Sequence, residues 1–420
     1  MALIPLFLFL ITLYVRPQDW MPGVIGFPTA FILLPLGLAV GFVNFMREPE
    51  KFRTPQVWLL PVYLVIMYLA TFASVGAGLA FEQFDIFTRR MLIFYIVIWT
   101  LTTPQRIGAT IWMVLLLSGF LAFQAILQAL TGECWGGLTP FPGYEEIRVR
   151  WYGDWDGPNV FGLLFVIAFG FALEYVFGPH KLWARLSAAT LGAAYIVAIY
   201  FTNSRGAVLA LACMVLFYFK NRFKSMFAVG ITVAVVGAIF ALGPSRMSEV
   251  SSKESSAHER TWLWEQALVL LRQNPALGVG RGQFSRRVDL GLIAHNNYVQ
   301  NFTETGLLGF FCFISLVWFS FKGNFTLRNP RYGVSREIAS YGRMMTASLV
   351  GYSAVTFFVV MELDLLYFIF GLCAAVYLVA RRECVDLPRL AFTAKDLTII
   401  IGIMSGIIFM IWLAAVKHIL

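Results

Sequence analysis

Long apolar stretches recur along the whole chain and are separated by short polar connections. Most are long enough to cross about 30 Å of hydrocarbon. A segment inside the bilayer must satisfy its own backbone hydrogen bonds, so these stretches predict helices. The pattern therefore predicts an all-α, polytopic transmembrane helix bundle of about 12–13 spans, forming one integral membrane domain over residues 1–420. The expected spans, the first of them short, are 2–15, 24–45, 57–79, 89–102, 107–130, 158–177, 184–201, 206–219, 225–242, 300–321, 343–361, 365–380 and 397–417.

Two polar segments interrupt the apolar pattern, residues 131–157 and the longer 243–297. Charged and amide side chains are costly in lipid, so both segments are expected at or outside the bilayer. The longer one holds the richest set of reactive side chains. An active site, if the chain has one, is expected mainly there.

Lysine and arginine gather in every second connection, which predicts the orientation of the chain. The side enriched in these residues faces the cytoplasm. The basic connections are 46–56, 220–224, 322–343 and 381–396. This orientation puts the N-terminus inside, and it puts residues 131–157, 202–205 and 243–297 on the outer face.

Composition agrees with a membrane protein and excludes other classes. The chain is 59% hydrophobic and 13% charged, with a mean hydropathy of +0.74, which is too apolar for a soluble globule. Its net charge of +9 comes without a nucleic-acid reading motif, so we expect no nucleic-acid partner. The five cysteines are scattered without a CxxC pair, which indicates neither a disulfide framework nor a zinc site.

The larger outer segment is expected to contain a short amphipathic helix on the membrane surface. Ser256 and Glu259 fit a capping box, and Asn274-Pro275 ends the helix after Gln273. Arg260 falls in the first turn, where the free amides and the helix dipole favour an anion. Two interpretations remain open at this point: Arg260 binds a phosphate group, or it pairs with a neighbouring glutamate.

Arg205 lies in a tight Thr-Asn-Ser-Arg-Gly turn, residues 202–206, between two strongly apolar stretches. An arginine at the end of a span is often an interfacial anchor. The adjacent hydroxyl of Ser204 favours a phosphate or diphosphate ligand instead.

His295 lies where the larger outer segment returns to apolar sequence. A neutral imidazole can accept a proton near physiological pH. It is either a structural hydrogen-bonding group or a general base. Polar residues around it favour a sugar-binding or catalytic site: Asn296, Asn297, Tyr298 and Gln300.

Three further polar motifs carry weaker signals. Residues 278–282, Gly-Val-Gly-Arg-Gly, follow no βαβ pattern and predict a tight turn rather than a dinucleotide site. Asp154 and Asp156 match a DxD metal pattern but are better explained as part of a solvated turn. Glu362 and Asp364 lie between two late spans on the outer face, and three interpretations remain open for them: they bind a cation, they bind a sugar, or they bind nothing.

Taken together, these motifs resemble the O-antigen ligase and O-antigen polymerase superfamily of bacterial polytopic membrane glycosyltransferases, best over residues 150–320. The opening residues 14–20 also look like a subgroup of O-glycosylation ligases that occur beside exosortase systems. The motifs that carry the main resemblance are the 202–206 turn, Arg260 with Trp264, Asn274-Pro275 before Gly278-Val279-Gly280, the Ala294–Tyr298 segment, Glu304–Gly309, and Gly157-Pro158-Asn159 in place of an Asp-Pro-Asn element.

The resemblance implies a GT-C-like, metal-independent glycosyltransferase without a cofactor, located in the bacterial inner membrane with its site facing the periplasm. The donor would be a glycan linked to undecaprenyl diphosphate. Arg205 and Arg260 would bind the diphosphate, and His295 would be the general base. Supporting or acceptor-binding roles would fall to Ser204, Trp264, Asn296, Asn297, Tyr298 and Asn159.

The acceptor hydroxyl is left open by the sequence. Lipid A core would make the protein a lipopolysaccharide ligase, and a protein hydroxyl would make it an O-glycosylation enzyme. A second lipid-linked repeat would make it an O-antigen or exopolysaccharide polymerase, with a chain-length regulator as a further partner. Two other classes, a lipid-linked oligosaccharide flippase and a non-catalytic scaffold, remain as alternatives.

Overall fold

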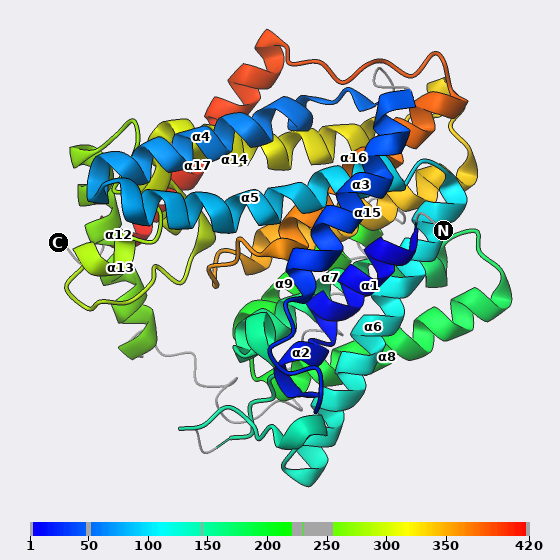
Figure 1. The fold of residues 1–420 in the computed structure, drawn as a ribbon, viewed down its shortest axis with the longest axis horizontal. Coiled ribbons are helices and arrows are strands. Elements are labelled where there is room, and N and C mark those ends of the chain that lie inside the picture. Colours follow the sequence, from blue (N-terminus) through cyan, green and yellow to red (C-terminus); the bar gives the residue numbers. More distant parts are fainter. Residues whose placement is uncertain (1–2, 48–51, 144–145, 221–229, 231–254, 417–420) are drawn as a thin grey trace.

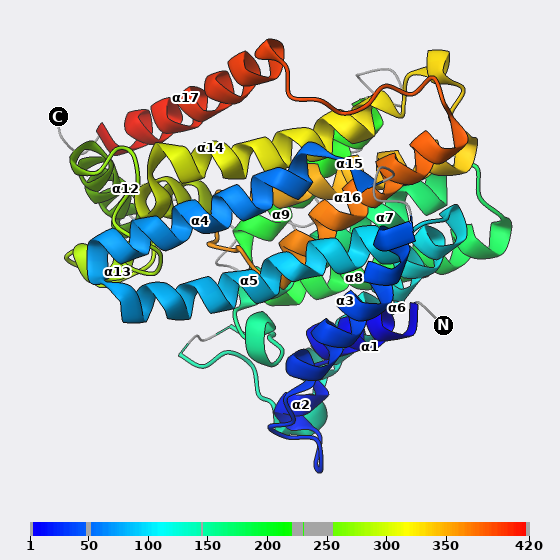
Figure 2. The same ribbon diagram turned by 45° about the horizontal axis from the view of Figure 1, so that its top comes forward.

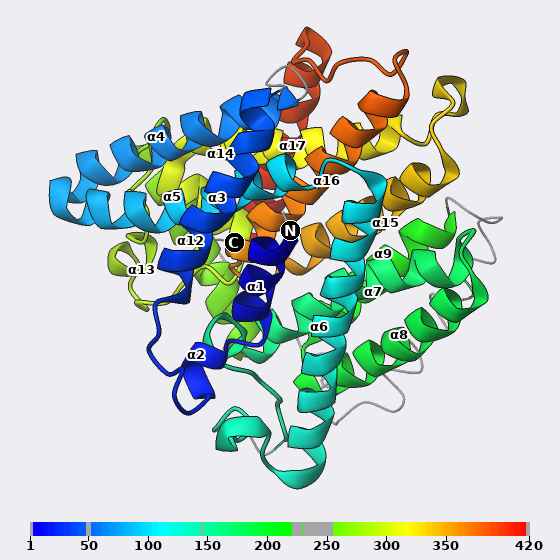
Figure 3. The ribbon, with the colours of Figure 1, turned by 45° about the vertical axis from the view of Figure 1, so that its right-hand side comes forward.

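The computed structural model describes residues 3–47, 52–143, 146–220, 230 and 255–416. Within these ranges the regular structure is helical and contains no strand, which confirms the all-α prediction (Figures 1–3). The helices are α1 (Leu3–Tyr14), α2 (Pro17–Trp20), α3 (Thr29–Arg47), α4 (Pro55–Val75), α5 (Ala77–Thr100), α6 (Pro104–Thr131), α7 (Pro158–Phe177), α8 (Leu182–Thr202), α9 (Arg205–Lys220), α12 (Ser255–Gln273), α13 (Phe284–Arg287), α14 (Asn297–Thr326), α15 (Arg336–Val355), α16 (Asp364–Glu383) and α17 (Ala394–Val416), with short 3₁₀ turns at Trp135–Gly137, Gly153–Trp155 and Pro330–Tyr332.

Seven of the described helices are long and apolar enough to cross a bilayer, namely α4, α6, α7, α8, α14, α16 and α17. The chain is therefore a multi-pass membrane protein, as the hydrophobic pattern predicts. α1 is a short apolar helix, in agreement with the expected short first span. The predicted span 225–242 and the beginning of the larger outer segment, residues 243–254, lie outside the described residues.

The predicted break between the spans 57–79 and 89–102 is wrong. α4 turns at Gly76 directly into α5, which runs without interruption through the charged residues. The helix accommodates these charged residues because their side chains form ion pairs and hydrogen bonds. Arg89 pairs with Asp85 one turn away at 2.6 Å, and Arg90 donates to the backbone oxygen of Glu362 at 2.9 Å.

The predicted span 343–361 is also placed too late in the chain. α15 begins at Arg336 and ends at Val355, and residues 356–363 form an irregular segment. This segment is apolar in sequence and so looks like the continuation of a span. In the structure its backbone binds the start of α14 instead, since the Asn297 amide donates to the Thr356 oxygen at 2.8 Å.

The bundle has two chemically different ends. At one end, three of the predicted basic connections come together, where Arg382 donates to the Thr102 oxygen at 3.0 Å and stacks over Phe52. Lys322 and Asp396 pair at the same end at 2.7 Å. We call this the basic end. The opposite end, called the loop end, carries α12, α13 and the starts of α14 and α16 (Figures 1 and 2).

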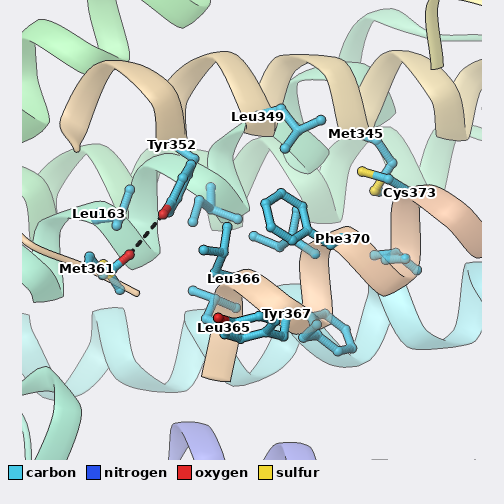
Figure 4. Close-up of a cluster of buried hydrophobic side chains, with 14 of the residues drawn as sticks. Leu163, Met345, Leu349, Tyr352, Met361, Leu365, Leu366, Tyr367, Phe370 and Cys373 are labelled. Carbon is cyan, nitrogen blue, oxygen red and sulfur yellow. Dashed lines mark hydrogen bonds between the residues drawn. The ribbon is translucent and has the colours of Figure 1, made fainter. Parts of the chain in front are cut away.

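A buried apolar cluster lies between α7, α15 and α16, beside the irregular segment that contains Met361 (Figure 4). Tyr352 reaches across it, and its hydroxyl donates to the Met361 oxygen at 2.8 Å. Both residues are almost fully buried. The cluster therefore holds the irregular segment 356–363 in place against α14.

Candidate active site

The Gly278–Gly282 segment binds the backbone of α14 where that helix is broken. Gly306 lies inside α14 with a φ of 63°, which interrupts the helical hydrogen-bond pattern. The returning loop replaces the lost bonds. Val279 and Gly280 donate to the oxygens of Thr303 and Glu304 at 2.9 and 3.0 Å, and Leu307 donates to the Pro275 oxygen at 2.8 Å. The glycines thus serve close backbone packing, in agreement with the predicted turn.

His295 has an unusual backbone conformation between two anchored neighbours. Its φ is 50°, in the left-handed region that non-glycine residues rarely occupy. Ala294 and Asn296 on either side are fully buried, while His295 itself is half-buried. Such conformations cost about 1–3 kcal/mol and persist where the surroundings hold them, often at functional sites.

α12 confirms the predicted helix up to Gln273 and lies against α14 and α17. Its buried face carries Leu263, Ala267 and Leu271. The proposed capping residue Ser256 is one of the positions whose side chains are not described. Trp264 faces the site, and its indole N–H donates to the Ala294 oxygen at 2.9 Å.

Arg260 acts electrostatically on His295, so the structure brings two of the predicted site residues together. Burial lowers the pKa of His295 below its ordinary value of 6.5. Arg260 lowers this pKa further, and Glu259 opposes the shift. The imidazole is therefore held in its neutral form at pH 7, as a proton acceptor must be.

The turn that carries Arg205 is built as a tight junction between α8 and α9. Asn203 adopts the left-handed conformation, with φ 52°, and its side chain donates to the Ile147 oxygen at 2.8 Å. Ser204 is buried, and its hydroxyl accepts from the Ala207 amide at 3.3 Å. Gly206 packs directly against Phe358 in the irregular segment 356–363. Since that segment also binds the start of α14, the Arg205 turn and His295 share one structural unit.

Arg148 is a buried residue that sequence reasoning missed. Its guanidinium donates to the Thr202 oxygen at 3.4 Å and to the Asn159 side chain at 3.3 Å. It therefore ties the smaller loop 131–157 and the start of α7 to the Arg205 turn. The sequence offered little signal for it, because its partners lie 11 and 54 residues away.

Arg281 belongs to a second group that was missed, a buried ionic cluster at the loop end. Its guanidinium lies 2.7 Å from Glu362 and 3.4 Å from Glu304, and all three residues are buried. Burial alone lowers the pKa of a guanidinium, but the two carboxylates outweigh it and raise the pKa of Arg281. Tyr63 donates to Glu362 at 2.8 Å. The available signal was Glu304 itself, an ionisable residue inside an apolar stretch.

The other acidic candidates are paired with arginines. Asp154 lies 3.5 Å from Arg16, and Asp156 lies 2.9 Å from Arg150. Asp364 lies 3.4 Å from Arg90. Among the described residues, no group of three or more His, Cys, Asp or Glu side chains gathers as metal ligands would. Metal independence itself stays a prediction.

Asn296, Asn297 and Tyr298 are buried and engaged with the protein. Asn296 caps α14 by accepting from the Tyr298 and Val299 amides at 2.9 and 3.1 Å. Asn297 accepts from the Met361 amide at 3.1 Å, and the Tyr298 hydroxyl donates to the Ser353 oxygen at 3.0 Å. These contacts suit residues that support the site. The side-chain NH₂ groups of Asn296 and Asn297 are buried without a hydrogen-bond partner, so an acceptor-binding role stays a prediction.

Two cavities in the described part of the chain are lined by residues other than Arg205, Arg260 and His295. One of ≈ 690 Å³ lies at the basic end, lined by residues such as Tyr218, Arg328 and Arg343. A second of ≈ 370 Å³ lies between the end of α4 and the loop 274–279. The site is therefore identified by its side chains and not by its volume.

The fold defines a class, a polytopic helical membrane protein, and Arg260 and His295 form a candidate site at the loop end of the bundle. Residues 188–314 match the family model described as O-Antigen ligase, a segment that includes Arg205, Arg260 and His295. This match supports the O-antigen ligase and polymerase superfamily that the sequence motifs suggested. No curated protein matches the chain.

Proposed function

We propose that the protein is an inverting glycosyltransferase that moves a glycan from undecaprenyl diphosphate to an acceptor hydroxyl on the periplasmic face of the inner membrane. Arg205 and Arg260 bind the diphosphate of the donor. His295 is the general base. The proposal includes no metal ion and no cofactor.

One observation carries this proposal: a half-buried histidine in a strained backbone conformation lies within the electrostatic reach of Arg260. A cation beside a neutral base suits a site in which an anionic leaving group departs as a hydroxyl loses its proton.

In the proposed step, His295 accepts the proton of the acceptor hydroxyl, and the hydroxyl oxygen forms a bond to the anomeric carbon of the donor sugar. The bond between that carbon and the diphosphate oxygen breaks, and the diphosphate keeps the electron pair. Arg205 and Arg260 stabilise the developing charge, and each charge-assisted contact contributes about 1.5–3 kcal/mol. Attack opposite the leaving group inverts the anomeric centre.

The proposal is tested with purified protein, lipid-diphosphate-linked glycan and an acceptor fraction in the presence of EDTA. We expect transfer in EDTA, and we expect His295→Ala to reduce turnover by about 10²–10⁴-fold, the usual contribution of a general base. His258→Ala is the matched control, since this exposed histidine lies in α12 two residues before Arg260. It should keep near wild-type turnover.

Two outcomes would overturn the proposal. If His295→Ala turns over like the wild type, the histidine is not the base. If transfer strictly requires Mg²⁺ or Mn²⁺, the chemistry belongs to a metal site. Movement of labelled lipid-linked glycan across vesicles without any transfer would replace the proposal with a flippase.

A further inference from the structure

We propose that Gln300 is a positioning residue, which links the buried Arg281–Glu304 pair to the backbone beside His295. The inference rests on the proposed function, because it assigns Gln300 a part in placing the general base. Nothing in the sequence motifs or in the family match gives Gln300 this role.

Gln300 uses both ends of its amide group. Its carbonyl oxygen accepts from the Ala294 backbone amide at 2.9 Å, and its NH₂ group donates to Glu304 at 2.5 Å. Gln300 and Glu304 are one helical turn apart in α14, so their side chains lie on the same face. All three residues are buried, so these hydrogen bonds are shielded from water.

The peptide groups beside His295 are thereby held from two directions. Gln300 fixes the Ala294 amide, and Trp264 of α12 donates to the Ala294 oxygen. On the other side, Asn296 is anchored as the cap of α14. With both neighbours fixed, the left-handed conformation of His295 is imposed by its surroundings.

The far end of the link is anchored in the bundle. Glu304 faces Arg281, whose guanidinium also binds Glu362 in the irregular segment just before α16. The Arg281 amide donates to the Thr71 hydroxyl of α4 at 2.9 Å. The link therefore ties His295 to α14, to α4 and to the segment that leads into α16. An ionic cluster of this kind keeps its geometry because each buried charge needs its partners.

The arrangement matters for catalysis because a base works only within hydrogen-bond reach of the proton that it accepts. A misplacement of about 1 Å can cost about 10²-fold in rate. Loss of the Gln300 side chain would leave His295 in the site but would remove the hydrogen bond that fixes the backbone beside it.

The test compares Gln300→Met, which keeps the volume but loses both hydrogen bonds, with the exchange Gln300→Glu/Glu304→Gln. The exchange keeps an acceptor for the Ala294 amide, an amide donor between the two side chains, and the total charge. It replaces the 3.4 Å contact of Arg281 with Glu304 but keeps the shorter ion pair of Arg281 with Glu362 at 2.7 Å. Asn324→Leu is the control, because Asn324 is a buried amide at the other end of the same helix. Turnover, donor KM and the rate at which diethyl pyrocarbonate modifies His295 are measured in the full-length protein.

For Gln300→Met we expect kcat to fall about 10–100-fold, with donor KM within about threefold of the wild type. Modification of His295 should become faster, since its backbone is no longer held. The exchange variant should recover turnover to within about fivefold of the wild type, and Asn324→Leu should leave both readouts unchanged.

The inference is overturned if Gln300→Met retains both kcat and the wild-type modification rate, or if Asn324→Leu lowers kcat to the same extent. The modification rate makes the two proposals separable. If His295→Ala remains active while Gln300→Met still speeds modification, the general-base proposal fails and the positional link stands.

Discussion

At the residue scale, the described part of the chain holds three non-glycine residues with positive φ: Arg16, Asn203 and His295. Two of them lie in the turns that carry the proposed site. Asparagine and histidine adopt this conformation more often than other non-glycine residues, but it remains uncommon for both. For His295 the cost is offset by the hydrogen bonds of its neighbours. The fold thus holds the His295 side chain in place despite the free-energy cost of its backbone conformation.

The pH dependence of turnover should report the surroundings of His295. A general base must be unprotonated, so activity falls as the pH drops through its folded-state pKa. Burial first and Arg260 second lower that pKa, so the acidic limb of the kcat/KM profile, which reports the free enzyme, should lie below the ordinary histidine value of 6.5. Arg260→Gln removes the second cause. We expect the acidic limb of its residual activity to move to higher pH.

Arg272→Gln is the control for this shift, because Arg272 is an exposed arginine in the last turn of the same helix. Its acidic limb should match that of the wild type. A limb that stays in place, or moves to lower pH, in Arg260→Gln would contradict the electrostatic coupling between Arg260 and His295.

At the element scale, α14 does most to organise the loop end. Its first turns carry the cap at Asn296, the link at Gln300 and the buried Glu304, and its break at Gly306 accepts the returning loop. The apolar pattern predicted the body of this helix but not its start, which lies at Asn297 rather than 300. Periodicity could not show the break, because the hydrogen bonds that compensate for it come from residues about thirty positions earlier.

Gly306→Ala should therefore be strongly destabilising. A Cβ at this position would lie 2.3 Å from the Ala276 oxygen, and the backbone is in the left-handed region. The conformational cost alone is about 1–3 kcal/mol. We expect a lower thermal unfolding temperature in detergent, together with loss of transfer activity.

Gly406→Ala in α17 is the matched control, since no atom lies within 4 Å of the added carbon. Alanine in a helix interior is more favourable than glycine by about 0.5–1 kcal/mol, so the control should unfold at the same temperature or higher. Equal unfolding temperatures for Gly306→Ala and the wild type would show that the loop does not depend on this close approach.

At the scale of the whole molecule, charged residues lie at both ends of the bundle and make different contacts at each end. At the basic end, arginines and lysines bind backbone oxygens and acids between helices, as Arg343 binds Glu174 at 2.8 Å. At the loop end, the proposed site takes Arg205 from the start of α9, Arg260 from α12 and His295 from the segment that leads into α14. The same polarity underlies the proposed orientation, in which the loop end faces the periplasm.

This orientation predicts the labelling of single cysteines in a background without the native five. Leu292→Cys lies at the loop end, and Val385→Cys lies at the basic end; their side chains are 44% and 92% exposed. A membrane-impermeant maleimide should label Leu292→Cys in cells whose outer membrane alone is permeable. It should label Val385→Cys only after the inner membrane is opened, and the reverse pattern would show the opposite orientation.

Much of the fold could be predicted from the sequence by itself. It determined the all-α class and the positions of most helices, because apolar runs of spanning length have no other stable structure in lipid. It also singled out Arg205, Arg260 and His295 as candidates through the motifs that resemble a known superfamily. The family model covers the segment that contains these residues, and the roles assigned to them stay predictions.

Only the tertiary structure decided how the site is held. Tyr63 meets Glu362 across 299 positions, and the Arg281 amide meets Thr71 across 210. The continuity of α5 and the end of α15 likewise depend on contacts with segments far apart in sequence. Gln300 has local partners, and Arg281, through Glu304, connects it to distant helices. Hydrophobic periodicity records which face of a helix is apolar, but a buried charge or amide is stable only beside its partner, and that partner is known only once the chain has folded.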